Sequence, residues 1–214
     1  MCYKKCYTSK KSAYIWDTRR GLANNLLQRE MMFLRKLILQ FIPLLIVLGS
    51  SLNADVQKAY FAGGCFWGVE YHFEKLEGVK SVVSGFMGGH IENPSYRDVV
   101  RGKSGHLEVV EVTYDPLKVS FETLAKLFFE IHDPTQKNGQ GPDIGSQYLS
   151  AIFTSDKKEK ETIYKLVGIL DKKGLEIATK IYEAKPFYKA EDYHQDYYEK
   201  TGKKPYCHSY KKLF

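Results

Sequence analysis

The sequence predicts an α+β fold, a two-layer sandwich in which helices cover a mixed, mainly antiparallel sheet. Two observations lead to this prediction. From residue 58 onward, short runs of β-branched and aromatic residues alternate with amphipathic segments of helical period. Their order is β-α-β-β-α-β, the order of a ferredoxin-like core, and one further helix and strand follow. Long polar loops between these elements are expected to form the functional site.

The first strand and helix are separated by two glycines. Residues 58–62 form a short apolar run that stops at Gly63 and Gly64. A helix is expected next, because apolar residues recur at three- and four-residue spacing before Gly78. These residues are Phe66, Val69, Phe73 and Leu76. The segment therefore predicts a strand, a tight turn and a helix.

Two further strands are predicted over residues 79–86 and 107–114, where Val and aromatic residues alternate with polar ones. A polar, glycine-rich stretch joins them at residues 88–106. A connection of this length in a compact domain is usually functional. We expect it to contribute side chains to the site.

The second half of the chain is expected to hold helix 120–132, strand 149–153, helix 156–173 and strand 178–184. Ser120 and Thr123 resemble a capping box at the start of the first of these helices, and Gly174 ends the second. A second long loop, residues 133–148, lies between the first helix and its following strand. The core is then complete at residue 153, and the last helix and strand are additions to it.

The net charge of +7 is concentrated at the N-terminus. Residues 1–54 contain nine Lys and Arg but only two acidic residues, so residues 55–214 carry 23 charges of each sign. Nucleic-acid binding proteins commonly show a strong basic excess in the binding domain. The globular part has no such excess, and we expect no nucleic-acid partner.

Residues 31–54 have the layout of a secretory signal peptide. Arg35 and Lys36 precede an apolar run from residue 37 to 48, which Pro43 interrupts and which is short for a membrane span. Cleavage after Ala54 is expected, although Leu52 fits the usual small-residue pattern poorly. We therefore expect a periplasmic or secreted protein that is not stably inserted in the membrane after signal cleavage.

Residues 1–30 precede this signal and show no helical or strand period. They are interpreted as a start codon assigned too early or as an unusually long basic region of the signal. On either interpretation Cys2 and Cys6 are absent from the mature chain, whose only cysteines are then Cys65 and Cys207. Residues 55–214 are expected to form a single domain.

Cys65 occupies the position most favourable for thiol chemistry. It ends the glycine turn and begins a helix, where unpaired backbone N–H groups and the helix dipole favour a thiolate. A thiolate is the nucleophilic form of cysteine. A buried and inert cysteine is the competing interpretation, because free cysteine is among the most buried residue types.

The residues after Cys65 resemble a known family. Residues 64–70, GCFWGVE, are similar to the nucleophile motif of the A-type peptide methionine sulfoxide reductases. The resemblance extends from Tyr60 to His208 through GFMGGH, NPSYRDV, GHLEVVEVTYDP, HDPTQKNGQGPDIGSQY, FYKAEDYHQDY and YCH. One departure is Phe86, where many relatives have Tyr; we expect little consequence. The resemblance implies reduction of the S epimer of methionine sulfoxide, free or in oxidised proteins, as protein repair.

The resemblance also implies roles for individual residues. Cys65 is the expected nucleophile, Phe66 and Trp67 wall a pocket for the S-methyl group, and Glu108 is the acid. Tyr96 and Tyr148 are expected to donate hydrogen bonds to the sulfoxide oxygen, and Asp143 to order the site. His194 lies in a family signature, but no role is assigned to it.

These residue types suit the chemistry of a sulfoxide. The sulfoxide oxygen is a poor leaving group unless it is protonated, so an acid is needed. A buried Glu can keep a proton near neutral pH, and two phenols can polarise the oxygen as it gains charge. Attack by the thiolate then releases methionine and leaves a sulfenic acid on Cys65.

Cys207 is the candidate resolving residue. It lies in a tail punctuated by Gly and Pro that we expect to be mobile enough to reach Cys65. Lys203, Lys204 and His208 could favour its thiolate. Its attack on the sulfenic acid gives a disulfide, which a thioredoxin or thioredoxin-like protein, or dithiothreitol in vitro, reduces. The chain lacks the later recycling cysteine of some relatives, so a single resolving step is expected.

Two alternatives remain open from the sequence. One is a cysteine hydrolase or thiol peroxidase, for which no accompanying Ser/His or Cys/His signature is found. The other is a secreted binding module with a structural Cys65–Cys207 disulfide. The six His residues show no metal-ligand spacing, so we expect no metal site. No organic cofactor is expected either. We expect a monomer.

Overall fold

The computed structural model describes residues 31–36 and 55–214. The chain divides into two units, Met1–Asn53 and Ala54–Phe214. In the first, residues 31–36 form a short exposed helix; residues 1–30 and the rest of the predicted signal peptide lie outside the described residues. Among the described residues, no helix is both long and apolar enough to cross a membrane.

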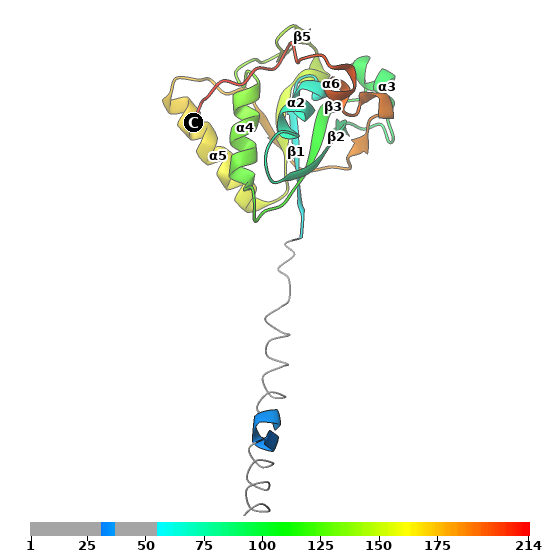
Figure 1. The fold of residues 1–214 in the computed structure, drawn as a ribbon. Helices are drawn as coiled ribbons and strands as arrows, with labels where there is room; N and C mark the ends of the chain where they lie inside the picture. The colour runs from blue at the N-terminus through cyan, green and yellow to red at the C-terminus, as the bar shows by residue number, and fades with distance from the viewer. Residues whose placement is uncertain (1–30, 37–54) are drawn as a thin grey trace, which may run out of the picture. The chain divides into compact units, whose positions relative to one another are not determined.

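A six-stranded sheet forms the centre of the second unit (Figure 1). Its strands are β1 (Gln57–Gly63), β2 (Val79–Met87), β3 (Leu107–Tyr114), β6 (Ser150–Phe153), β7 (Lys180–Tyr182) and β8 (Tyr188–Lys189). They lie in the order β7-β6-β1-β3-β2-β8, and every neighbouring pair is antiparallel except β6 and β7. The four central strands have the order of a ferredoxin-like sheet, which confirms the predicted mixed, mainly antiparallel arrangement.

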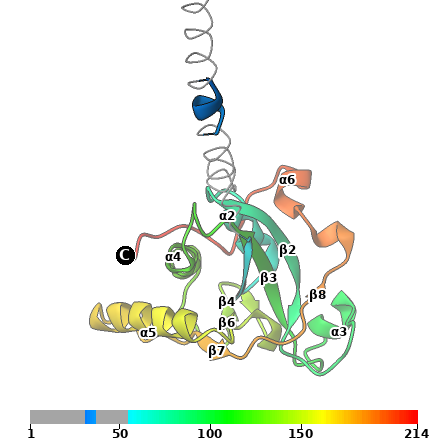
Figure 2. The same ribbon diagram turned by 90° about the horizontal axis from the view of Figure 1, so that it is seen from below.

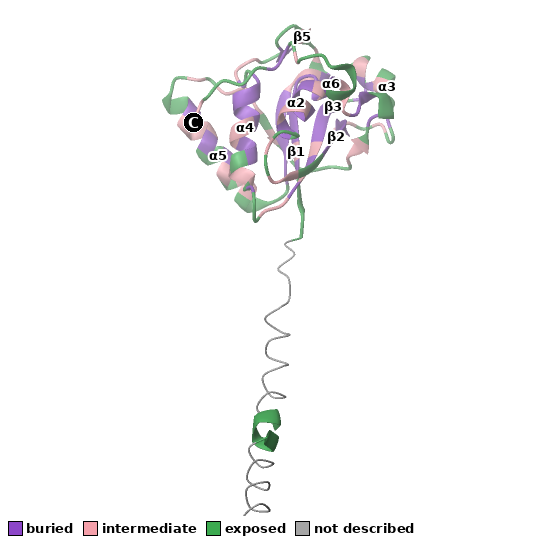
Figure 3. Ribbon diagram, viewed as in Figure 1, coloured by how far each residue is buried: buried purple, intermediate pink, exposed green. Residues whose placement is uncertain are grey.

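Three helices share one hydrophobic core with the strands (Figure 2). They are α2 (Phe66–Phe73), α4 (Phe121–Ile131) and α5 (Lys157–Lys172). The helices begin where the sequence predicts, because Ser120 and Asp156 accept hydrogen bonds from the backbone N–H groups of the third residue beyond them. Figure 3 shows buried residues on the central strands and on the inner sides of α2 and α4. The predicted two-layer fold is therefore confirmed.

The alternation of β3 decides which of its side chains reach the helices. Val110 and Val112 belong to the core shared with the helices, whereas Leu107 and Val109 belong to a smaller core cluster on the other face. Because strand side chains alternate between faces, Glu108 lies on the helix side of the sheet. Its cross-strand neighbour is Phe86 of β2.

Several short elements lie in segments where the sequence predicts neither a helix nor a strand. They are α3 (Tyr96–Val100), β4 (Gly139–Gln140), β5 (Asp143–Ile144), the 3-10 helices η1 (Ser146–Tyr148) and η2 (Asp192–His194), and α6 (Tyr197–Thr201). Such elements are too short to show a hydrophobic period. The predicted first helix also ends earlier, at Phe73, because the chain turns there before β2. The predicted strand 178–184 shrinks to the three residues of β7.

Candidate active site

The turn between β1 and α2 places Cys65 under the C-terminal tail. Gly64 has a φ of 96°, and a Cβ there would lie 2.4 Å from the Cβ of Gln140, so a glycine is required. Cys65 is the N-cap residue of α2 and is only 7% exposed. The sequence predicted this position at the start of the helix correctly.

The surroundings of Cys65 raise the pKa of its thiol in the reduced protein. The largest cause is a hydrogen bond with the thiol of Cys207, followed by burial; the backbone N–H of Trp67 acts in the opposite direction. The helix start was expected to lower this pKa. That effect is present but is outweighed, because the neighbouring Cys207 and the loss of water both disfavour a negative charge on Cys65. The resting Cys65 is therefore a neutral thiol.

Glu108 lies beside Cys65 and is almost completely buried, with 2% of its surface exposed. Its Oε2 accepts a hydrogen bond of 3.0 Å from the backbone N–H of Phe66, the first residue of α2. Burial raises the pKa of Glu108 well above its ordinary value, and the nearby Cys65 and Asp143 raise it further. This environment therefore favours the neutral carboxyl group of Glu108, the form that can donate a proton.

Two phenols flank this carboxyl group from two different loops. Tyr96 is the first residue of α3, where Ser95 and Asp98 form a capping box, and Tyr148 ends η1. Both rings are half-buried. Burial is the main cause that raises the pKa of each hydroxyl, and the nearby Glu108 side chain raises it further. Both tyrosines therefore stay protonated and can donate hydrogen bonds.

Phe66 and Trp67 contribute unequally to the aromatic wall. Phe66 is 1% exposed and packs on Phe86, with ring centroids 5.8 Å apart. Trp67 is only partly buried, and it stacks on Tyr197 at a centroid distance of 3.7 Å and an interplanar angle of 7°. Of the two predicted wall residues, Trp67 is therefore the one with surface available to a ligand.

His194, to which the sequence assigned no role, fixes the orientation of Trp67. The indole Nε1–H donates a 3.1 Å hydrogen bond to Nδ1 of His194, so the histidine carries its proton on Nε2. Burial lowers the pKa of His194, which keeps the ring neutral. The ring centroid lies 4.3 Å from that of Tyr96. His194 therefore connects the indole wall with one of the two phenols.

Asp143 acts on the site through charge and through Tyr206. It lies in β5, paired with Gln140, and both of its carboxylate oxygens lie 3.1 Å from the hydroxyl of Tyr206, which donates to them. Its charge contributes to the raised pKa values of Glu108 and Cys65. The sequence did not identify Tyr206, because nothing in the local pattern pairs it with a residue 63 positions away.

Cys207 is already at the nucleophile in this structure, as a free and buried thiol. The side-chain amide of Gln140 donates to its carbonyl oxygen at 3.5 Å. The tail beyond it is held by Glu130 of α4, whose Oε1 accepts from the N–H groups of Leu213 and Phe214 at 2.9 and 3.2 Å. The sequence predicted a mobile tail that reaches the site; here the tail is docked along α4 by specific hydrogen bonds.

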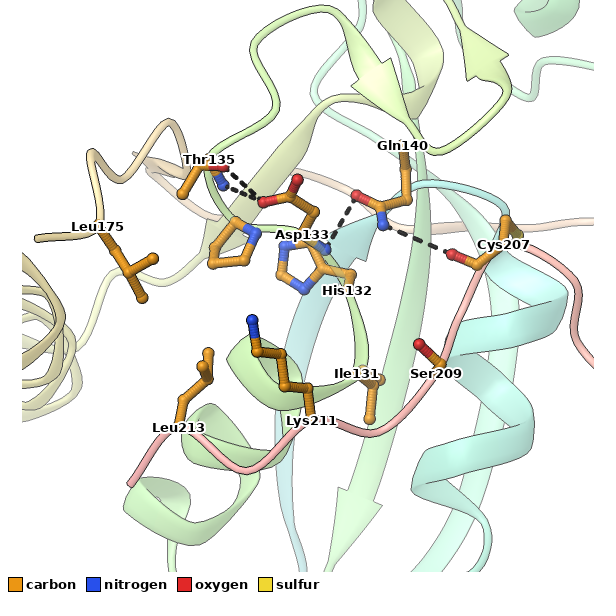
Figure 4. A pocket seen from close by; sticks show the side chains of 11 residues that line it. Ile131, His132, Asp133, Thr135, Gln140, Leu175, Cys207, Ser209, Lys211 and Leu213 are labelled. Atoms are coloured by element: carbon orange, nitrogen blue, oxygen red, sulfur yellow. Dashed lines mark hydrogen bonds between the residues drawn. The ribbon is translucent and has the colours of Figure 1, made fainter. Parts of the chain in front are cut away.

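A pocket of about 380 Å³ lies between this tail, the end of α4 and the loop after it (Figure 4). Cys207 and Gln140 line one end, and Leu175 and Leu213 line the other. Gln140 bridges the two walls, because its side chain contacts the backbone of both Asp133 and Cys207. The pocket therefore reaches Cys207 between the tail and the end of α4.

One group of carboxylates among the described residues has the spacing to hold a cation: Glu70, Glu74 and Asp196. Burial is the main cause that raises the pKa of Glu70 to about 8 and that of Glu74 to about 7. Lys200 also lies 3.2 Å from Asp196. Bound protons and the lysine therefore compensate the negative charges of this group at neutral pH.

Comparisons of the sequence with known proteins agree with this geometry. A model of the family described as peptide methionine sulfoxide reductase matches residues 57–213. The peptide methionine sulfoxide reductase MsrA of Chromobacterium violaceum is 46% identical over 155 residues, which cover 71% of this chain and 88% of the relative. That of Nautilia profundicola is 47% identical over 150 residues, covering 70% and 87%.

Solved structures show the same fold. The reduced form of Mxr1 from Saccharomyces cerevisiae matches with a TM-score of 0.68 and 34% identity, over 74% of this chain and 93% of that chain. The same yeast protein in complex with Trx2 matches with a TM-score of 0.50 and 26% identity, over 74% and 91%. Given the family match and the arrangement of Cys65 and Glu108, the chain belongs to the peptide methionine sulfoxide reductase family, the enzymes that reduce methionine sulfoxide to methionine.

Proposed function

We propose that this chain reduces the S epimer of methionine sulfoxide, free and in oxidised proteins, with Cys65 as the nucleophile. One observation carries the assignment of roles. The buried carboxyl group of Glu108 accepts a hydrogen bond from the residue that follows Cys65, so the proposed acid and nucleophile share one buried site. A sulfoxide needs both groups at once, because its oxygen must be protonated as its sulfur is attacked.

The first half-reaction transfers the oxygen to the enzyme. The Cys65 sulfur attacks the sulfoxide sulfur while Glu108 protonates the sulfoxide oxygen, and Tyr96 and Tyr148 donate hydrogen bonds to that oxygen. The new bond between the two sulfurs and the S–O bond of the substrate then break as the oxygen passes to Cys65, methionine leaves, and a sulfenic acid remains on Cys65. The proton lost by the Cys65 thiol returns to Glu108, which is then ready for the next turnover. Trp67, held by His194, contacts the S-methyl group, and the buried Phe66 supports that wall from behind.

The second half-reaction returns Cys65 to the thiol. The Cys207 thiol attacks the sulfenic sulfur, water leaves, and a Cys65–Cys207 disulfide forms. A thioredoxin-like dithiol then reduces this disulfide and is itself oxidised. The hydrogen bond between the two thiols supports the first of these steps. The complex of the yeast relative with Trx2 supports the second.

Single-turnover experiments with separate sulfoxide epimers test this scheme. Wild type should release methionine from the S epimer only, and Cys65→Ser should release none. Cys207→Ser should still release about one methionine per enzyme but should stall with thioredoxin as the reductant. Equal activity on both epimers, or methionine release by Cys65→Ser, would contradict the proposal.

The same experiments separate a catalytic disulfide from a structural one. A structural bridge predicts that Cys207→Ser loses folding stability, typically about 2–4 kcal/mol, without a specific defect in turnover. The proposed scheme predicts a bridge that forms after one addition of substrate and opens again with reductant. Mass spectrometry of the peptides containing residues 65 and 207 distinguishes the two.

We also propose that the protein acts outside the cytoplasm, as a monomer, after cleavage near Ala54. The support is the sequence of residues 31–54, with two cations followed by a short apolar run. N-terminal sequencing of the protein from fractionated cells tests this, with a start near Asp55 expected. An intact N-terminus at Met1 in the cytosolic fraction would contradict export, and sedimentation velocity would measure the oligomeric state.

A further inference from the structure

The imidazole of His208 bridges the resolving cysteine and the turn that carries the nucleophile. Its Nδ1 lies 3.0 Å from the sulfur of Cys207, and its Nε2 lies 2.7 Å from the carbonyl oxygen of Gly63. A carbonyl oxygen can only accept a hydrogen bond, so Nε2 carries the hydrogen. The neutral ring then has its free lone pair on Nδ1, directed at Cys207.

The charge state of the ring follows from its surroundings. His208 is 5% exposed, and burial is the main cause that lowers its pKa. The Gly63 carbonyl and Asp143 act in the opposite direction. His72 of α2 and His132 also face the ring, and burial lowers the pKa of each of these two histidines. The ring is therefore neutral at neutral pH, and the Cys207 thiol donates its hydrogen to Nδ1.

Helix α2 leaves room for this ring at Gly68. A Cβ at that position would lie 2.1 Å from Nδ1 and 2.7 Å from Cγ of His208. Any other residue there would displace the imidazole from between α2 and the Gly63 carbonyl. The ring is thus held by two elements that also hold Cys65, although His208 itself is in the tail.

We propose that His208 is the general base of the resolving step, taking the proton of Cys207 as its sulfur attacks the sulfenic acid on Cys65. This inference rests on the proposed function. In the step the S–H bond of Cys207 breaks, the S–S bond forms, and the S–O bond of Cys65 breaks. The proton passes from His208 to the departing hydroxide, which leaves as water, so the ring is neutral again at the end.

The hydrogen bond to Gly63 gives the base a second function. When Nδ1 takes the proton, the Nε2–H···O bond becomes charge-assisted and therefore stronger. The imidazolium is stabilised by the residue two positions before the nucleophile. A positive ring beside Cys207 also favours departure of the hydroxide.

Two substitutions separate the two contacts of the ring. His208→Gln places an amide near the Nε2 position, so it keeps a donor for Gly63 but has no base beside Cys207. His208→Asn places an amide oxygen near Nδ1, which can accept a hydrogen bond from the thiol but cannot take its proton.

Gly68→Ala keeps the histidine and displaces its ring. Gly168→Ala is the matched control, because nothing lies within 4 Å of a Cβ there.

The experiment measures two rates in one acid-quenched turnover with the S epimer: methionine release, and formation of the Cys65–Cys207 disulfide by peptide mass spectrometry. We expect disulfide formation to slow relative to methionine release by about 10²-fold or more in both His208 variants and in Gly68→Ala, near neutral pH. Gly168→Ala should leave both rates unchanged. In wild type the rate of disulfide formation should rise with pH through the lowered pKa of His208, and the two His208 variants should lack this rise.

Three results would overturn the proposal. One is disulfide formation at the wild-type relative rate in His208→Gln and His208→Asn. Another is a rate of disulfide formation in the His208 variants that is lower by the same factor at every pH but still rises with pH as in wild type. That result would show that His208 only positions Cys207. The third applies if either His208 variant fails to fold. In that case, folded Gly68→Ala that forms the disulfide at the wild-type rate relative to methionine release would overturn the proposal. A wild type that turns over without any Cys65–Cys207 disulfide would instead contradict the resolving step itself, and the mass spectra identify that case directly.

Discussion

Cys65 and Cys207 meet in one buried site, but the chain brings them there by different means. Cys65 lies between a central strand and a helix, and β1 is paired along its length with β3 and β6. Cys207 lies in a segment without helix or strand, from residue 202 to 214. That segment is held by individual side-chain contacts from Gln140, Glu130 and His208.

The difference follows the chemistry that we propose for each cysteine. The nucleophile must keep a constant geometry toward Glu108, and sheet register supplies this because many backbone hydrogen bonds must break together before it changes. The resolving cysteine must form a disulfide and later present it to a large reductant. Contacts through a few side chains can open locally at small cost, which regular structure cannot do.

The largest expected effect is on the sheet side of the site, at Glu108. Glu108→Gln removes the proton donor but keeps an acceptor for the N–H of Phe66. Methionine release should slow by about 10²–10⁴-fold, with a smaller effect on substrate binding. Single-turnover rates with the S epimer measure this.

The pH dependence of the same rate sharpens the test of Glu108. Because its pKa is raised, the acid is protonated and active at lower pH and is lost as pH rises through the raised pKa. The wild-type rate should therefore fall with rising pH along this limb. The Gln variant should lack the limb; a variant that keeps the wild-type rate and profile would remove Glu108 from the mechanism.

The aromatic wall should show a smaller effect that divides between its two residues. Trp67→Ala should reduce kcat/KM by about 10–200-fold, on the order of 1–3 kcal/mol, because it removes the exposed pocket contact. Phe66→Ala should also lower the free energy of unfolding, by about 3–5 kcal/mol, because that ring is fully buried. Chemical denaturation and steady-state kinetics separate the two, and equal unfolding losses would contradict the division.

On the tail side, Glu130→Ala should lower the free energy of unfolding by about 1.5–3 kcal/mol, because two backbone N–H groups lose a charged acceptor. Glu130→Gln keeps a neutral acceptor and should cost less. Hydrogen exchange of Leu213 and Phe214 should become faster in the Ala variant, while that of β1 stays unchanged. Unchanged exchange at the tail would show that Glu130 does not hold it.

The smallest expected effect is that of Tyr206→Phe. It removes one hydroxyl that donates to Asp143 at a partly exposed site. A loss of about 0.5–1.5 kcal/mol in unfolding free energy is expected, as for a typical single hydrogen bond. Denaturation curves of the variant and wild type measure it, and a loss as large as that of Phe66→Ala would contradict the comparison between tail and sheet.

Much of the fold followed from local patterns. The alternation over residues 107–114 predicted β3 with its correct bounds, and Ser120 predicted where α4 begins. The shorter elements α3, β8 and α6 were missed, because two to five residues cannot show a period. The order of the central strands followed from the order of the elements, since β-α-β-β-α-β chains pair in few ways.

The sequence by itself determined which residues are proposed for the site: motifs around Cys65, Glu108 and Cys207 point to them without reference to any distance. Only the tertiary structure decided which side chains they contact and how their pKa values are shifted. Trp67 and His194 are 127 residues apart, and Gly63 and His208 are 145 apart. No local period relates such positions, and the burial that raises the pKa of Glu108 and lowers that of His208 exists only after the sheet, α2 and the tail have packed together.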